Sequence, residues 1–282
     1  MDRGTPFEFL QLDVFSEEPC RGNPVAIVLD RDGVLDTAKM QRLANWTNLS
    51  ETVVMIPAGA QRYKARIFTP HEELDFAGHP TIGAAHAALI WGVVEPGEFI
   101  QECGLGEVEL VGSLEEGIMA ELSSPNRITP DGVDLAELEA AIGGAVYELE
   151  LLDIGPKWFV ARVDSVEELY ELEPDFAALA AFEAKHPPAT GTTLYALSLD
   201  EVVHVRSFAP RHGIPEDPVC GSGNLCVGGH MCITGQRSPG ESWVARQGAA
   251  IGRDGRVRVE LRGDRIKLGG RAARVFEGLA HL

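Results

Sequence analysis

Hydrophobic and polar positions alternate along much of the chain, in short runs that end at Gly, Pro or Asp. Alternation with a period of two is typical of strands with one buried face. The runs that predict strands are residues 7–15, 24–30, 52–58, 63–70, 106–111 and 117–125. Apolar residues spaced by three and four positions predict helices at residues 35–45, 81–91, 135–142 and 166–172. The pattern therefore predicts a protein in which strands dominate and helices lie between them.

Segments in the second half of the chain repeat segments in the first half at an almost constant offset. At an offset of 140 residues, 10–15 matches 150–155, 49–55 matches 189–195, and 64–70 matches 204–210. The segment around Gly78 matches the segment around Gly221 at an offset of 143. The shared register makes a chance origin of these weak identities less plausible.

A repeat of about 140 residues has the size of a domain, not of a solenoid unit. We therefore predict two similar lobes, residues 1–125 and 126–269, and residues 270–282 could complete the first lobe. Each lobe is expected to wrap a mostly β structure around one apolar helix. These helices are predicted to begin near Pro80 and near Ser222. The expected fold class is α+β.

Both predicted helices begin at a glycine, in the sequences AGHPT and CGSGN. A helix start offers unpaired backbone N–H groups and a partial positive charge, and glycine lets a ligand approach the backbone closely. Gly78 and Gly221 are therefore candidate anion-binding positions, which two lobes related by a quasi-twofold axis would turn toward one cleft. The expected ligand is a small carboxylate. The alternative is that both glycines only form tight turns before buried helices.

The composition excludes several classes of partner. The net charge of −19 over 282 residues argues against binding to nucleic acid or to anionic membrane surfaces. The five cysteines form no C-x-x-C pair and no common zinc spacing, so we expect reduced thiols, no metal site and a cytoplasmic protein. The N-terminal segment lacks a secretion signal, and the longest apolar run, residues 81–94, is too short to span a bilayer.

Five blocks in a fixed order resemble the PhzF-like family of phenazine-biosynthesis isomerases. The blocks are DVFSEEPCRGNPVAIVLD, NLSET, ARIFTPHEELDFAGHPTIGAA, FAPRHGIPEDPVCGSGN and RQGAAIGR. The resemblance implies the diaminopimelate epimerase-like fold, with two pseudo-symmetric β-barrel-like lobes, each wrapped around a central helix. It also implies a homodimer that needs no metal or organic cofactor. The activity typical of the family is isomerisation of trans-2,3-dihydro-3-hydroxyanthranilate.

Carried over to the matching positions of this chain, the resemblance makes Glu51 the general acid/base. The other positions that match the family's site are Gly78, His79, Asp217, Gly221 and Ser222, with Cys220 in place of a threonine. Asp217 and His79 would hydrogen-bond an amino or hydroxyl group of the substrate. The amides near Gly78, Gly221 and Ser222 would hold its carboxylate.

The repeat indicates that the site is chemically one-sided, which means that its reactive groups have no equivalent in the other lobe. Glu51 corresponds to Gly191, and Cys220 corresponds to Ala77, so neither group has a chemically equivalent mate. Inverting a stereocentre without a cofactor usually takes one group on each face of the carbon. A single acid/base suits removal of a proton and its return on the same face, so we favour isomerisation over racemisation.

Alternative interpretations remain open at this point. The chain could be a thiol-assisted amino-acid epimerase that uses Cys220, or a small-molecule-binding protein without catalysis. Taken singly, Glu51 could be a solvated carboxylate, His79 a helix cap and Asp217 a turn residue. Apolar surroundings in the sequence predict that two further histidines, His86 and His230, are packed side chains. The tryptophans are expected in the core or at an interface, and these are Trp46, Trp91, Trp158 and Trp243.

Overall fold

The computed structural model of the protein describes residues 4–129, 132–185 and 189–282. The chain forms two compact units, which are described separately. Unit 1 comprises Met1–Glu121 and Gly269–Leu282, and unit 2 comprises Leu122–Leu268. Strands run both parallel and antiparallel within each unit, so the protein is an α+β protein with a mixed sheet, as the sequence predicts.

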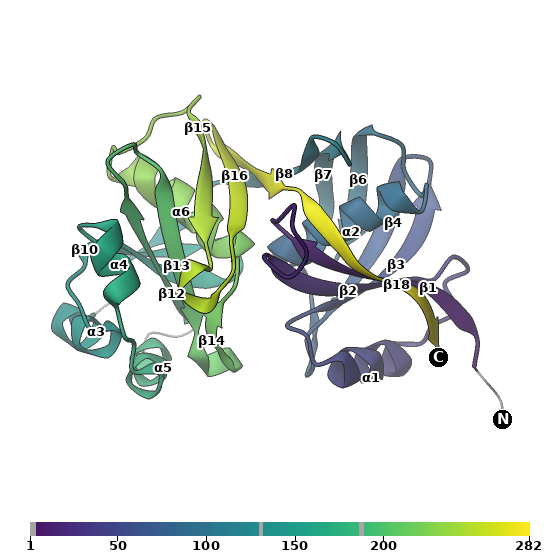
Figure 1. The fold of residues 1–282 in the computed structure, drawn as a ribbon, viewed down its shortest axis with the longest axis horizontal. Helices are drawn as coiled ribbons and strands as arrows, with labels where there is room; N and C mark the ends of the chain where they lie inside the picture. The colour runs from purple at the N-terminus through teal and green to yellow at the C-terminus, as the bar shows by residue number, and fades with distance from the viewer. Residues whose placement is uncertain (1–3, 130–131, 186–188) are drawn as a thin grey trace. The chain divides into compact units, whose positions relative to one another are not determined.

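Unit 1 contains two helices and most of the strands of the first half of the chain (Figure 1). Its elements are β1 (Pro6–Val14), β2 (Asn23–Leu29), α1 (Thr37–Thr47), β3 (Thr52–Gly59), β4 (Arg62–Phe68), β5 (Glu73–Leu74), α2 (Gly78–Ile90), β6 (Gly97–Cys103), β7 (Gly106–Ser113), β8 (Gly117–Ser123) and β18 (Ala272–His281). The C-terminal strand β18 pairs antiparallel with β1, which explains why residues 269–282 belong to this unit.

Unit 2 has a similar order of strands with more helix (Figure 1). Its elements are β9 (Asn126–Ile128), α3 (Leu135–Ile142), β10 (Tyr147–Asp153), β11 (Lys157–Arg162), α4 (Val166–Glu171), α5 (Phe176–Lys185), β12 (Ala189–Leu197), β13 (Val203–Ala209), the 3₁₀ turn η1 (Pro210–His212), β14 (Ile214–Asp217), α6 (Gly221–Ile233), β15 (Ser242–Gln247), the 3₁₀ turn η2 (Ala249–Ile251), β16 (Gly255–Arg262) and β17 (Arg265–Gly270). Strand β17 crosses the boundary into unit 1, as β8 does in the other direction.

Helix α2 forms the centre of unit 1. All ten residues from His79 to Ala88 are buried, and the helix contacts strands β1, β2, β3, β4, β7 and β18. A helix that is apolar all round is stable only when it is covered on every side. Its small residues permit this close packing, because a Cβ on Gly83 would lie 2.6 Å from Val25 Cγ1.

Helix α6 has the same place in unit 2, where it contacts β10, β11, β12 and β16. Its glycines are poor helix formers, yet Gly228 and Gly229 are buried within it. A side chain at Gly229 would overlap the ring of Pro125. Packing against the strands therefore overrides intrinsic propensity in this helix.

The strand register of unit 2 reproduces that of unit 1 at the predicted offset. Thr52 pairs with Phe68 in β3 and β4, and Thr192 pairs with Phe208 in β12 and β13, 140 residues later for both partners. The parallel pairs β2–β3 and β11–β12 also correspond, with Ile27 opposite Val53 and Val160 opposite Thr193. The predicted internal repeat is therefore confirmed at the level of hydrogen-bonded register.

The outer helical layers distinguish the two units. In unit 1, α1 packs against one apolar cluster that includes Met40, Val54 and Phe68. In unit 2, helices α3, α4 and α5 cover a larger cluster that includes Leu138, Leu169 and Phe182. Helix α5 was not predicted, because its alanine-rich sequence FAALAAFEAK has little contrast between apolar and polar positions.

The tryptophans differ in their burial. Trp158 of β11 is a core residue, at 3% exposed. Trp46 of α1 is 82% exposed, so a core position is wrong for this residue. Trp91 and Trp243 are half-buried. The sequence alone does not separate these cases, because exposure depends on which face of an element the rest of the chain covers.

Candidate active site

Glu51 lies between α1 and β3, directly after a tight reversal of the chain. Asn48 ends α1 in the left-handed conformation, with φ 54°, and the chain then turns into β3. The Glu51 side chain is only 14% exposed, so its interpretation as a solvated carboxylate is wrong. Burial raises the pKa of Glu51 to about 7, although a hydrogen bond with the Ser50 side chain works in the opposite direction. A carboxyl with this pKa can both accept and donate a proton near neutral pH.

His79 is an ionisable neighbour of Glu51 within unit 1. Its Nε2 lies 3.4 Å from Glu51 Oε2, and its side chain is 6% exposed. The N-cap of α2 is Ala77, and no side chain caps this helix start, so the interpretation of His79 as a helix cap is wrong. The imidazole instead lies beside the carboxyl, at the first turn of the helix.

Asn23, at the start of β2, determines which ring nitrogen of His79 carries the proton. The amide nitrogen Nδ2 of Asn23 lies 3.4 Å from His79 Nδ1. An amide nitrogen only donates, so Nδ1 accepts, and the neutral ring carries its hydrogen on Nε2. His79 therefore presents an N–H group to the Glu51 carboxyl.

The loop before Asn23 is held by a buried carboxylate. Asp13 accepts hydrogen bonds from the backbone amides of Arg21 and Gly22, at 2.6 and 2.7 Å. A Cβ at Gly22 would overlap the carbonyl oxygen of Val14, so only glycine fits there. Sequence reasoning missed Asp13 and Asn23 as site residues, although both lie in the first block of the family resemblance.

Cys220 caps the start of α6 in unit 2. Its Sγ accepts a hydrogen bond from the amide of Gly223 at 3.2 Å, and the residue is 3% exposed. Burial, reinforced by the nearby charge of Asp217, raises the pKa of the Cys220 thiol well above its ordinary value. The thiol is therefore protonated at neutral pH and performs the capping role that threonine performs at many helix starts.

Asp217 and Ser222 lie on either side of this cap. The Asp217 carboxylate accepts a hydrogen bond from the amide of Val219 at 3.1 Å, which is the turn geometry that the sequence suggests for Asp before Pro. Ser222 is half-buried, and its Oγ lies 3.4 Å from Cys220 Sγ. Gly221 is the buried first residue of the helix.

Gln247, at the end of β15, connects the pieces of this helix start. Its side-chain carbonyl accepts from the Cys220 amide at 3.1 Å and from the side-chain amide of Asn224 at 2.8 Å. Its own amide donates to the carbonyl oxygen of Asp217 at 3.0 Å. Gln247 is 1% exposed, so these bonds fix the backbone around Asp217 and Cys220 without competition from water. The sequence offered no signal for this role beyond the RQGAAIGR block.

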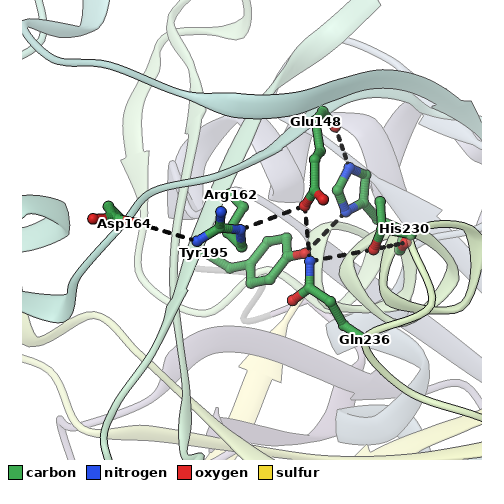
Figure 2. Close-up of polar contacts among 7 residues, drawn as sticks. Glu148, Arg162, Asp164, Tyr195, His230 and Gln236 are labelled. Carbon is green, nitrogen blue, oxygen red and sulfur yellow. Dashed lines mark hydrogen bonds and ion pairs between the residues drawn. The ribbon is translucent and has the colours of Figure 1, made fainter.

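The two other histidines of interest are packed side chains, as predicted. In unit 2, His230 Nε2 donates to the carbonyl oxygen of Glu148, and the Tyr195 hydroxyl lies 3.0 Å from His230 Nδ1 (Figure 2). Figure 2 also shows Gln236 donating to the Glu148 carboxylate, which extends this hydrogen-bonded network beyond the end of α6. His86 of α2 lies with its Nε2 3.2 Å from the carbonyl oxygen of Gly270.

The predicted site residues therefore form two groups, one in each unit. Glu51, Gly78 and His79 belong to unit 1. The residues of unit 2 are Asp217, Cys220, Gly221 and Ser222. Within the part of the chain that the structure describes, no group of three or more His, Cys, Asp or Glu side chains is arranged to hold a metal ion. Of the helices in the described ranges, none is long and apolar enough to cross a membrane.

The α+β fold and the sequence define the class of protein, a PhzF-family isomerase. The family described as "Phenazine biosynthesis-like protein" matches residues 12–278, and the chain belongs to this family. Trans-2,3-dihydro-3-hydroxyanthranilate isomerase of Pseudomonas aeruginosa is 32% identical over 97% of this chain and 99% of that protein. Antisense-enhancing sequence 1 of Schizosaccharomyces pombe is 34% identical over 97% of this chain and 98% of that protein.

Solved structures agree with this assignment. The PhzF-family phenazine biosynthesis protein of Bacillus anthracis superposes with a TM-score of 0.86 at 25% identity, over 99% of this chain and 100% of that chain. A hydroxyproline epimerase from Agrobacterium vitis shares the fold alone, with a TM-score of 0.66 at 14% identity, over 98% of this chain and 93% of that chain. The chain is thus an isomerase of the PhzF family.

Proposed function

We propose that the protein is a cofactor-independent isomerase that moves a proton between carbon atoms of a small, carboxylate-bearing substrate. The observation that carries this proposal is the buried Glu51 beside His79, because burial raises the pKa of that carboxyl to about 7. Three relatives over 30% identical are named for isomerisation of trans-2,3-dihydro-3-hydroxyanthranilate, which makes this compound the first substrate to test.

In the proposed reaction, ionised Glu51 removes a proton from one ring carbon of the substrate. The electron pair of the broken C–H bond enters the conjugated system, and a double bond shifts. Protonated Glu51 then returns the proton to another carbon, so the product has the same atoms as the substrate. The Nε2–H group of His79 stabilises the ionised form of Glu51 at the start and end of each cycle.

The start of α6 is proposed to bind the substrate's carboxylate. The backbone amides of Gly221 and Ser222 lie in the first turn of a 13-residue helix, where N–H groups lack intrahelical partners. The Ser222 hydroxyl adds a side-chain donor. Asp217 is proposed to accept a hydrogen bond from an amino or hydroxyl group of the substrate, and Gly78 to provide a backbone amide in unit 1.

One acid/base group fits isomerisation better than the two-base alternative. Gly191 occupies the position in unit 2 that corresponds to Glu51, and a Cβ there would overlap the carbonyl oxygen of Phe208. Unit 2 therefore has no room for a second carboxyl at that position. Cys220, the other candidate base, is buried, protonated and committed to capping α6. These observations favour the isomerase over a thiol-assisted epimerase.

We further propose that each unit is a β-barrel-like lobe around its central helix and that the protein acts as a homodimer in the cytoplasm. The repeated strand register supports the first statement. Light scattering coupled to size-exclusion chromatography tests the dimer, and a monomeric mass at micromolar concentration would contradict it.

Turnover of trans-2,3-dihydro-3-hydroxyanthranilate by the wild-type protein and by Glu51→Gln, followed by proton NMR, tests the function. The structure offers a matched control in Glu183, a second carboxyl whose pKa burial raises, to about 8. We expect Glu183→Gln to turn over substrate and Glu51→Gln to be inactive. An active Glu51→Gln variant would remove the proposed base.

A further inference from the structure

Trp158 of β11 lies against two residues of the proposed carboxylate-binding region. Its indole Nε1 donates to Ser222 Oγ at 3.1 Å. Its Cζ3 atom would lie 2.8 Å from a Cβ built on Gly191. Trp158 is 3% exposed, so its ring is fixed by the surrounding core. Trp158 is thus a core residue, and it is also the hydrogen-bond donor to the Ser222 hydroxyl, which is proposed to bind the substrate.

The strand register identifies the counterpart of Trp158 in unit 1. In unit 1, Ile27 pairs with Val53. In unit 2, Val160 pairs with Thr193. Thr193 is the repeat counterpart of Val53, because the two positions are 140 residues apart. Ile27 therefore corresponds to Val160, and two residues earlier on each strand Val25 corresponds to Trp158. The aliphatic side chain of Val25 has no hydrogen-bond donor and packs toward α2. At this position of the repeat, only unit 2 carries an indole.

The hydrogen bond from Trp158 restricts what the Ser222 hydroxyl can do. An indole N–H only donates, so Ser222 Oγ is the acceptor, and its own hydrogen points away from the indole. Another neighbour of this oxygen is Cys220 Sγ, at 3.4 Å. A thiol sulfur is a weak acceptor, and this one already accepts from the Gly223 amide. The Ser222 hydrogen is thus available to a stronger acceptor such as a carboxylate.

We propose that Trp158 is a positioning residue that makes Ser222 a hydrogen-bond donor to the substrate's carboxylate. The same ring lies against Gly191 and, together with the Phe208 carbonyl, leaves no room for a second acid/base side chain in unit 2. One residue thereby orients the carboxylate ligand and keeps the chemistry one-sided. This inference rests on the proposed function, because it assumes that the start of α6 binds a carboxylate.

A double-mutant cycle on ligand binding tests the proposal without requiring turnover. The probe is 3-hydroxyanthranilate, an aromatic compound with the same carboxylate, amino and hydroxyl groups as the proposed substrate. Its carboxamide is the matched probe without the charge. Dissociation constants are measured by titration calorimetry for wild type, Trp158→Phe, Ser222→Ala and the double variant. Trp46→Phe is the control for loss of an indole, because Trp46 is 82% exposed and lies in unit 1.

We expect Ser222→Ala to weaken carboxylate binding roughly 10- to 100-fold, as loss of a hydrogen bond to a charged group does. Trp158→Phe should weaken it about 3- to 10-fold, and the double variant should bind no more weakly than Ser222→Ala. The carboxamide should bind weakly to all variants, and Trp46→Phe should match wild type. Thermal midpoints are recorded for each variant, so that a misfolded protein is recognised and replaced by Trp158→Tyr.

Three results would overturn the proposal. The first is wild-type affinity in a folded Trp158→Phe or Trp158→Tyr variant. The second is a double variant in which the losses of binding free energy from the two single substitutions add. The third is a wild-type protein that binds the carboxamide as tightly as the carboxylate. Failure of the proposed function would appear as an active Glu51→Gln variant. That result would not change the dissociation constants of the double-mutant cycle, so the two failures are distinguishable.

Discussion

Glu51 Oε2 lies 3.4 Å from His79 Nε2, and both side chains are largely shielded from water. The pair joins a residue that precedes β3 to the first turn of α2, so its geometry depends on the packing of that helix within unit 1. Burial disfavours the charged carboxylate, while a hydrogen bond with the Ser50 side chain favours it. The balance leaves the pKa of Glu51 at about 7, so this carboxyl can both gain and lose a proton at neutral pH.

The first prediction concerns the pH dependence of the reaction. The base is the ionised form of Glu51, and burial raises the pKa of this carboxyl to about 7. The value of kcat/KM should therefore rise with pH, with an apparent pKa of about 7, and fall about tenfold per pH unit well below it. Initial rates between about pH 5 and pH 9 measure this profile. A plateau that extends to the acid end of this range would show that a carboxyl with an ordinary pKa, or another group, is the base.

Substitution of His79 tests the partner of the base. His79→Phe fills a similar volume but removes the N–H group that faces Glu51. We expect activity to fall roughly 10- to 1,000-fold and the pH profile of the residual activity to move to higher pH, because the carboxylate loses a stabilising donor. A profile at the wild-type position would show that His79 does not act on Glu51.

Cys220 should tolerate replacement by another capping residue. Cys220→Thr keeps a side-chain acceptor for the Gly223 amide, so turnover should stay within about threefold of wild type. Cys220→Ala should lower the free energy of unfolding by about 1 kcal/mol without abolishing turnover. Urea titrations and initial rates measure the two effects. Inactivity of a folded Cys220→Thr protein would favour the thiol-assisted epimerase.

Glu183 should make unit 2 less stable as pH rises. It is 0% exposed, its Oε1 accepts from Thr192 Oγ1 at 3.0 Å, and within the described ranges its Oε2 has no hydrogen-bond partner. Burial raises the pKa of Glu183 from 4.5 to about 8, so the folded state binds a proton that the unfolded state releases. The stability that protonation provides is complete below pH 4.5 and is lost as pH rises toward 8.

Glu183→Gln should remove this pH dependence, because the amide stays neutral. Its advantage in the free energy of unfolding over wild type should be small at about pH 4 and should grow to about 2–4 kcal/mol at about pH 8. Urea titrations at intervals of one pH unit provide the comparison. A constant difference across this range would contradict the raised pKa.

Much of the fold could be predicted because local signals and packing agree. The range predicted for α3, residues 135–142, is the observed one, since Asp134 caps its start and Gly143 ends it in the left-handed conformation. Helix α2 begins at Gly78, earlier than the predicted start at residue 81, because Ala77 has no side-chain cap to mark the boundary. The repeat was visible because paired strands preserve their register.

The supporting residues of the candidate site could not be predicted in the same way. Asn23 and His79 are 56 residues apart, and Trp158 and Ser222 are 64 apart, so their contacts depend on how strands pack against the central helices. Gln247 lies 27 residues from Cys220 and reaches it from a strand. No local pattern encodes these contacts. The family resemblance identified Glu51 and the helix starts, but not the side chains that hold them.

Hydrogen exchange at carbon, followed for Glu51→Gln and Glu183→Gln in deuterated water, tests the central claim most directly. Wild type and Glu183→Gln, incubated with trans-2,3-dihydro-3-hydroxyanthranilate, should form the isomer. Deuterium should enter at the carbon that receives the proton in those turnovers in which protonated Glu51 exchanges its proton with solvent before returning it. Glu51→Gln should give neither isomer nor deuterium in the recovered substrate. Isomer formation by folded Glu51→Gln at a rate within about tenfold of wild type would contradict the account.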